Sequence, residues 1–295
     1  MQSNPSTLRR PAAAGRSPLA LLALSLVALA GCGPLRTPAA PEAGALLGPG
    51  DVLRLHNEWA DSIQHVWSRA ELLLNFPRGQ GSENRKQFDI EGHLFLVKPD
   101  KLFLHGEVLG QEMFKLGMNP EQYWLWIRPD VNTVWLGRRG GTGEQRLVMP
   151  PEALMTALGV FHIEPAPEAS AVFIALERYY ILCESRGVGG TQVPFRRVWF
   201  DRRTLRPARI DLFDDTGRRV LFAELLRYER FGETDVCTVY RARNYRDEEV
   251  DVVIQLSGVS LEKKPSPKVF EYHLPAGATE RDMDDAEPPP APAKP

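Results

Sequence analysis

The chain has 295 residues, of which 43% are hydrophobic and 25% are charged, and its formal net charge at pH 7 is −2. A chain of this length holds one large domain or two small ones, and we expect one because no internal linker is visible. Nucleic-acid binding requires clustered basic residues, and this charge balance does not predict them.

The N-terminal segment has the composition of a secretion signal. Arg9, Arg10 and Arg16 precede the apolar run Leu19–Ala30, and the first acidic residue is Glu42. A basic region followed by an apolar region is typical of a signal peptide, which is removed from the mature protein. We therefore predict a signal peptide over residues 1–31, whose removal changes the formal charge from −2 to −5.

The apolar run ends in a lipobox, Leu29-Ala30-Gly31-Cys32. Small residues admit a signal peptidase, and the Cys32 thiol accepts a diacylglyceryl group. A transmembrane helix would need about 20 apolar residues, more than this run provides, and an ordinary signal peptide would not require a cysteine here. We expect lipidation at Cys32, because a pair of acyl chains anchors a protein where a single chain does not.

Both ends of the expected mature chain are tethers. Residues 32–49 are rich in Pro, Ala and Gly, which predicts a flexible spacer. Residues 279–295 form an acidic and then proline-rich tail that we expect to be disordered. The folded domain is predicted to cover residues 50–278.

The domain begins with an amphipathic helix and continues as strands. Asp51–Val66 has apolar residues at helical spacing, with Asp51 as the predicted cap. A second short helix is predicted over Pro150–Gly159, which has prolines at its start and a glycine at its end. The predicted strands are Trp67–Phe76, Phe88–Val97, Lys101–Val108, Gln111–Met118, Gln122–Arg128, Thr133–Arg138, and then Phe173–Cys183, Val193–Asp201, Pro207–Asp214, Arg219–Arg230, Val236–Arg243 and Val250–Leu261.

Most of these strands have one apolar and one polar face. The predicted fold class is therefore mainly β (α+β): a curved antiparallel sheet of roughly 11–12 strands forming an open half-barrel, with the two helices as lid or plug. Such a sheet either closes on its own side chains or leaves an apolar cavity. The candidate cavity-lining residues are Ile90, Leu94, Leu96, Leu102, Leu104, Phe114, Leu116, Trp124, Trp126, Ile210 and Leu212. Cross-strand aromatic packing is an alternative role for the tryptophans.

The order of elements resembles the LolA/LolB-like periplasmic lipoprotein carriers and receptors. The resemblance covers residues 52–275 and is carried by Lys101-Leu102-Phe103-Leu104, by Gly117–Trp126, by the hairpin Val198–Pro207 and by Ile210–Asp214. It implies an open half-barrel with a helical lid whose concave apolar face receives acyl chains. A lipid-anchored member is similar to the receptor of the pair. Because Gly33 rather than Asp follows the lipidated cysteine, the resemblance also implies a cell-envelope location, in the outer membrane facing the periplasm.

The sequence predicts no catalytic residues, cofactor or metal. No Gly-x-Ser-x-Gly, paired carboxylates or phosphate-binding glycine loop is present, and the six histidines lack metal-ligand spacing. Cys183 and Cys237 lie on separate predicted strands, which favours two free thiols over a disulfide.

Two functions follow from these patterns. The first is a lipid-anchored module that binds acyl chains of lipoproteins, or another amphiphile, in an apolar cavity. The second is a structural or assembly lipoprotein with a packed interior that contacts an envelope protein partner. An open cavity beneath the first helix would favour the first function.

Overall fold

The computed structural model describes residues 46–77, 85–128, 132–141, 151–164, 171–245 and 250–284. The predicted signal peptide, the lipobox with Cys32, most of the tether and residues 285–295 of the tail lie outside the described residues. Among the residues it describes, no helix has both the length and the apolar character that crossing a membrane requires.

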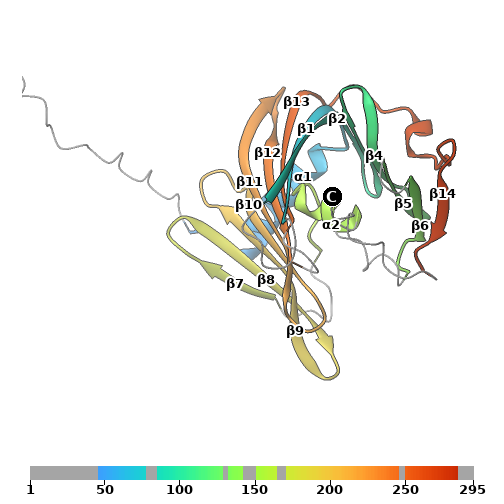
Figure 1. Cartoon of the computed structure of the whole chain (residues 1–295). Helices are drawn as coiled ribbons and strands as arrows, with labels where there is room; N and C mark the ends of the chain where they lie inside the picture. The colour runs from blue at the N-terminus through green and yellow to red at the C-terminus, as the bar shows by residue number, and fades with distance from the viewer. Residues whose placement is uncertain are drawn as a thin grey trace, which may run out of the picture. The chain divides into compact units, whose positions relative to one another are not determined.

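The described strands form one curved open sheet in the order β14-β6-β5-β4-β3-β2-β1-β13-β12-β11-β10-β9-β8-β7 (Figure 1). Neighbouring strands pair antiparallel, except that β14 pairs parallel with β6. The strand bounds are β1 His65–Pro77, β2 Arg85–Val97, β3 Lys101–Val108, β4 Gln111–Met118, β5 Gln122–Ile127, β6 Thr133–Arg138, β7 Ala171–Ala175, β8 Tyr179–Val188, β9 Thr191–Asp201, β10 Pro207–Phe213, β11 Arg219–Phe231, β12 Thr234–Asn244, β13 Val250–Ser260 and β14 Thr279–Asp282.

The predicted class, a curved antiparallel half-barrel with two helices, is confirmed, but the sheet has 14 strands rather than the expected 11–12. One additional strand arises because the predicted strand Phe173–Cys183 is wrong. The chain turns in the middle of this segment, where the Leu176 backbone N–H donates to the Tyr179 carbonyl at 2.8 Å, so that β7 and β8 form a hairpin. The turn consists of the exposed residues Glu177 and Arg178, so no Gly, Pro or Asn marks it in the sequence.

The second additional strand, β14, lies beyond the predicted domain end at residue 278. It pairs with β6 through four residues, and the N–H of the next residue, Met283, donates to the Leu136 carbonyl at 2.7 Å. Met283 is fully buried in the main core. Residues 279–284 are mostly polar, so their composition did not predict a strand that packs on the core.

Two α-helices and a short 3₁₀ helix, η3 (Pro267–Phe270), accompany the sheet. The first, α1 (Pro49–Ser62), ends before the predicted Val66, because Ile63 is extended and His65 already belongs to β1. Its N-cap is Gly48 rather than Asp51, with proline in the first turn. The second, α2 (Pro151–Ala157), ends at a turn in which Gly159 has a φ of 77°.

Both α-helices pack against the apolar face of the sheet (Figure 1). Val52, Trp59 and Ala60 of α1 and Leu154 of α2 belong to the same core cluster as buried residues of strands from both halves of the sheet. Alternation along β3 gives the sheet one face that the helices can cover: Leu102, Leu104 and Gly106 are buried, whereas the residues between them are only half-buried. The helices therefore fill much of the concave side.

Candidate functional site

The predicted cavity-lining residues divide between two faces of the sheet. Seven of them are at most 6% exposed and belong to the main core: Ile90, Leu94, Leu96, Leu102, Leu104, Leu116 and Ile210. Phe114 and Leu212 are half-buried against that core. These side chains pack against helices and neighbouring strands, so in this structure the described part of the interior is largely filled by protein.

Trp124 and Trp126 lie in a separate apolar cluster. They pack with Val134, Phe103 and Tyr272, while the alternating residues of β5 face the other way: Tyr123 belongs to the main core and Leu125 packs against it. Alternation along β5 places the two tryptophans on the face opposite the core. The alternative weighed from the sequence, cross-strand aromatic packing, describes their surroundings better than a cavity wall.

A pocket among the described residues has a volume of about 680 Å³. Its walls come from the end of α1, the β2–β3 turn, α2, the segment 160–164 and β9. Small-molecule sites occupy pockets of about 300–1,000 Å³. None of the eleven predicted lining residues contributes to it.

The apolar part of this pocket comes from residues that the sequence analysis did not select. Met118 is buried at the end of β4 and Val160 follows α2. Met155 of α2 and Phe161 are half-buried and pack against the main core. A patch of methionine and aromatic side chains is adaptable and apolar.

Three cationic side chains border the same pocket, and each has a partner. Lys98 donates to the Ala60 carbonyl, and burial lowers its pKa. The Arg139 guanidinium lies 3.1 Å from Asp100 Oδ2 and 3.0 Å from Glu152 Oε1. Arg196 donates to Glu184 Oε1 at 2.8 Å, with its guanidinium 4.5 Å from the centre of the Phe161 ring.

The segment 160–164 is held against α1 by side chains of the helix. Asn57 accepts from the Ile163 N–H at 2.9 Å and donates to the Ile163 carbonyl at 3.0 Å. The His56 ring Nε2 lies 2.9 Å from the Phe161 carbonyl oxygen. Burial lowers the pKa of His56 to about 4, so the ring is neutral near pH 7 and its Nε2–H donates. Helix α1 therefore positions one wall of the pocket.

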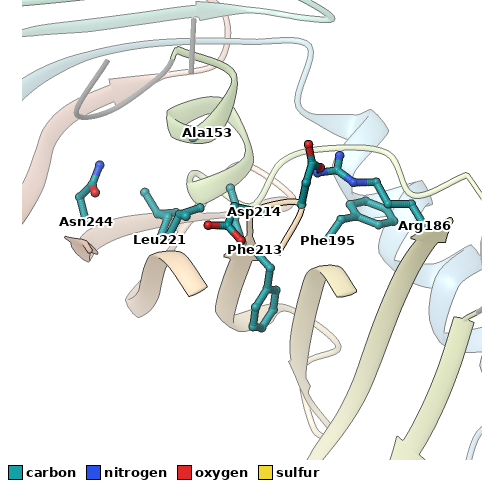
Figure 2. Close-up of a pocket in the computed structure, with 10 residues that line it drawn as sticks. Ala153, Arg186, Phe195, Phe213, Asp214, Leu221 and Asn244 are labelled. Atoms are coloured by element: carbon teal, nitrogen blue, oxygen red, sulfur yellow. The ribbon is translucent and has the colours of Figure 1, made fainter. Parts of the chain in front are cut away.

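A second, smaller pocket of about 250 Å³ lies beside α2 and strands β9–β11 (Figure 2). Its residues include Ala153, Phe195 and Leu212, and Leu212 is one of the predicted lining residues. Arg186 pairs with Asp215 at its edge. The charged edge and small volume make this pocket a weaker candidate for an acyl chain.

Both remaining cysteines are free thiols, as the sequence favoured. Cys237 is buried, and this burial raises its pKa to about 12, which keeps it protonated. Cys183 is half-buried on β8. A protonated, buried thiol is a poor nucleophile.

Comparison with solved structures identifies the fold. A DUF1329 family protein from Desulfovibrio piger superposes with a TM-score of 0.53 at 17% identity, covering 75% of this chain and 95% of that one. A LolA superfamily protein from Nitrosomonas europaea gives 0.51 at 11% identity, covering 77% and 99%. A domain from Vibrio parahaemolyticus, described as an outer membrane lipoprotein-sorting protein, gives 0.51 at 10% identity, covering 75% and 94%.

These likenesses show that the domain has a LolA-like fold, which confirms the resemblance seen in the sequence. No protein-family model and no curated protein matches the sequence. The comparisons therefore establish the architecture, and the function is argued from the site.

Proposed function

We propose that this protein is a lipid-anchored envelope lipoprotein that binds an amphiphile, either the acyl chains of lipoproteins or another lipid. The observation that carries the proposal is the pocket of about 680 Å³, which combines an apolar wall with a border of paired charges, Lys98, Arg139 and Arg196 beside Asp61, Glu152 and Glu164, in a LolA-like domain. An acyl chain would bury its surface against Met155 and Phe161, and an anionic headgroup would face Lys98, Arg139 or Arg196. Binding of this kind works by removing apolar surface from water and needs no chemical step.

The pocket, rather than the buried face of the sheet, is the place to test amphiphile binding. Replacing Leu104 or Leu116 with a charged residue would bury that charge in the core and unfold the domain. Met155→Glu introduces a carboxylate at the pocket and leaves the deepest core intact. Leu226, exposed on β11, offers a matched control in Leu226→Glu.

Native mass spectrometry of residues 46–284 with added diacyl phosphatidylglycerol measures the binding. We expect one bound lipid on the parent domain and on Leu226→Glu, and at least about tenfold less on Met155→Glu, because a carboxylate in an apolar contact costs more than 1.4 kcal/mol. Equal occupancy of the two variants would remove the pocket from the proposal. A folded parent domain that takes up no lipid would remove amphiphile binding altogether.

The anchor is the second part of the proposal. The signal pattern and the lipobox support lipidation of Cys32, and Gly33 supports transfer to the outer membrane. Expression with labelled palmitate in a bacterial host is expected to label the parent chain and not the Cys32→Ser variant. Label retained by Cys32→Ser would place the acyl group elsewhere and contradict the lipobox assignment.

One observation favours a second function, assembly through protein contacts. Strand β7 is an edge strand of the sheet, and its Val172 and Ile174 side chains are exposed. An apolar edge strand can pair with a strand of another protein. Together with the packed interior, this edge supports an envelope protein partner if lipid uptake is absent.

A further inference from the structure

Four glutamates stand in register across the outer face of strands β1–β4. Glu71 pairs directly with Glu91, Glu91 with Glu107, and Glu107 with Glu112. Their chain neighbours Leu72, Ile90 and Gly106 are buried on the core side, so the carboxylates lie on the opposite face. Like charges directly opposite one another destabilise a sheet. This row is therefore costly unless a cation lies against it.

A β-bulge places the fourth glutamate in this row. The pairing of β3 with β4 shifts between Gly106, which opposes Phe114, and Glu107, which opposes Glu112. In regular register Glu107 would oppose Met113, and Glu112 would project toward the core face. Bulges often redirect a side chain next to a functional site. Here the bulge brings a second carboxylate beside Glu107.

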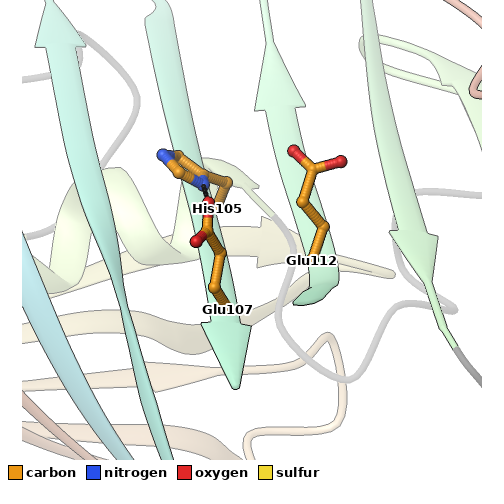
Figure 3. A group of neighbouring side chains, drawn as sticks. All are labelled: His105, Glu107 and Glu112. Carbon is orange, nitrogen blue, oxygen red and sulfur yellow. Dashed lines mark ion pairs between the residues drawn. The ribbon is translucent and has the colours of Figure 1, made fainter. Parts of the chain in front are cut away.

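His105 lies next to these two carboxylates (Figure 3). Its side chain is only 16% exposed, and its Nδ1 is 3.8 Å from Glu107 Oε1. This buried Nδ1 makes no hydrogen bond with any described residue. The ligand atoms of His105, Glu107 and Glu112 all lie within 4.8 Å of one another.

A second histidine orients the first. His93 pairs with His105 across β2 and β3, and its Nδ1 is 3.2 Å from His105 Nε2, with the rings stacked at 5.2 Å between centroids. If His105 Nε2–H donates to His93, the lone pair of His105 Nδ1 faces the carboxylates. Sequence spacing missed this arrangement, because strand pairing brings residues twelve apart into contact.

We propose that His105, Glu107 and Glu112 bind a divalent transition-metal ion, with Zn²⁺ as the best fit. One imidazole nitrogen with two carboxylates suits Zn²⁺, whereas Mg²⁺ and Ca²⁺ favour oxygen ligands alone. His93 acts as a positioning residue through His105 Nε2, as the outer partners of metal-binding histidines do. The metal would offset the repulsion between the two glutamates.

One cation already competes for this site. Lys115 Nζ lies 2.8 Å from Glu112 Oε1, and it also lies 5.3 Å from the centre of the Trp126 ring. Metal binding requires this ammonium group to leave the carboxylate, and the indole face offers it another position. Removing the lysine charge is therefore expected to strengthen metal binding.

The bound metal would join β3 and β4 close to the turn that connects them. That turn, Leu109-Gly110, carries the fully exposed side chain of Leu109. Metal occupancy would hold the base of this hairpin on the outer face of the sheet, opposite the core. This inference does not depend on amphiphile binding, because none of its residues borders the pocket of about 680 Å³.

Calorimetric titration of the full-length chain in detergent, stripped of metal with EDTA, tests the site with Zn²⁺ alone and with Mg²⁺ alone. We expect one equivalent of Zn²⁺ to bind in the micromolar range or tighter, and Mg²⁺ to bind far more weakly. His105→Gln and Glu112→Gln should each weaken Zn²⁺ binding by about 100-fold, and His93→Ala by about tenfold. Glu71→Gln, in the same glutamate row but outside the ligand set, is the matched control and should bind as the parent does.

Two further readouts separate lost binding from lost folding. Without metal, Glu112→Gln should melt close to the parent's temperature, because it removes both the repulsion with Glu107 and the exposed ion pair with Lys115. Lys115→Gln should bind Zn²⁺ several-fold more tightly. The proposal is overturned by the absence of saturable Zn²⁺ binding, or by a loss in Glu71→Gln as large as in Glu112→Gln, which would indicate a diffuse acidic surface.

Discussion

Leu109 combines two unusual properties in one residue. Its side chain is fully exposed at the β3–β4 turn, and its backbone φ is 51°, in the left-handed region that costs an L-residue about 1–2 kcal/mol. Gly110 also has a positive φ, a combination for which the preferred first residue is Asn. Leu109 is bulky and apolar, yet its side chain is surrounded by solvent and its backbone conformation is unfavourable. Such a residue is a candidate for a contact outside the domain.

Leu109→Asn is expected to stabilise the domain, and it also tests whether the exposed turn leucine contacts a membrane. The change suits the left-handed backbone and should raise the free energy of unfolding by about 1 kcal/mol, measured by urea denaturation. Flotation of residues 46–284 with lipid vesicles should retain less of Leu109→Asn than of a control, Leu226→Asn, on the exposed surface of β11. Equal retention of the two variants would show that the turn leucine makes no membrane contact.

Residue-level prediction succeeded where burial alone was at issue. The alternation of Leu94, Leu96, Leu102 and Leu104 identified core-facing positions, and all four are buried. Burial does not distinguish a packed core from a cavity wall, because that depends on what the helices and loops place opposite the sheet. Met155 and Phe161, which border the pocket, belong to no repeating pattern in the sequence.

At the scale of elements, hydrophobic period predicted most strands and lost accuracy at their boundaries. Alternation places β3, β4 and β6 at the bounds observed. Helix α1 was extended too far because Ile63 and Val66 are buried in the helix–strand junction and in β1, and so continue the apolar spacing without helical backbone. Buried apolar residues at a helix–strand junction fit the helical spacing as well as the strand, so the spacing does not show where the helix ends.

Strand β14 shows what a local reading of the chain misses. Its four residues, Thr-Glu-Arg-Asp, are exposed and polar, so neither alternation nor composition predicts a strand. They pair with β6 because the chain arrives there from β13 and η3, with Asn132 Nδ2 donating to the Gly277 carbonyl at 2.8 Å. The strand also covers the exposed edge of β6, which limits unwanted pairing with other chains.

At the scale of the whole molecule, one main core joins the two halves of the sheet. His56 lies at this junction: its ring is 5.1 Å from Phe200 of β9, 5.6 Å from Trp59 of α1 and 5.7 Å from Phe161, measured between centroids. The ring is fully buried. Protonation of this single side chain therefore acts on the stability of the entire domain.

Global stability is accordingly expected to fall as the pH drops below about 6.5. Burial lowers the pKa of His56 to about 4 in the folded state, from its ordinary value of 6.5, so between these values the unfolded chain binds a proton that the folded chain does not. This contribution to stability is complete above pH 6.5, falls toward pH 4 and then levels off, with a total loss of about 3 kcal/mol from this residue. Urea denaturation of the parent and of His56→Gln at pH 7.5 and at pH 4.5 measures this loss in the free energy of unfolding. The glutamine amide keeps a donor for the Phe161 carbonyl and does not titrate. Carboxylates and the other histidines contribute equally to the pH dependence of both chains, so their contributions cancel in the difference.

The parent should lose about 2–3 kcal/mol more than the variant between these two pH values, in one cooperative transition. Parallel losses in both chains would mean that His56 is accessible to protons in the folded state, and that the core around α1 is open rather than packed.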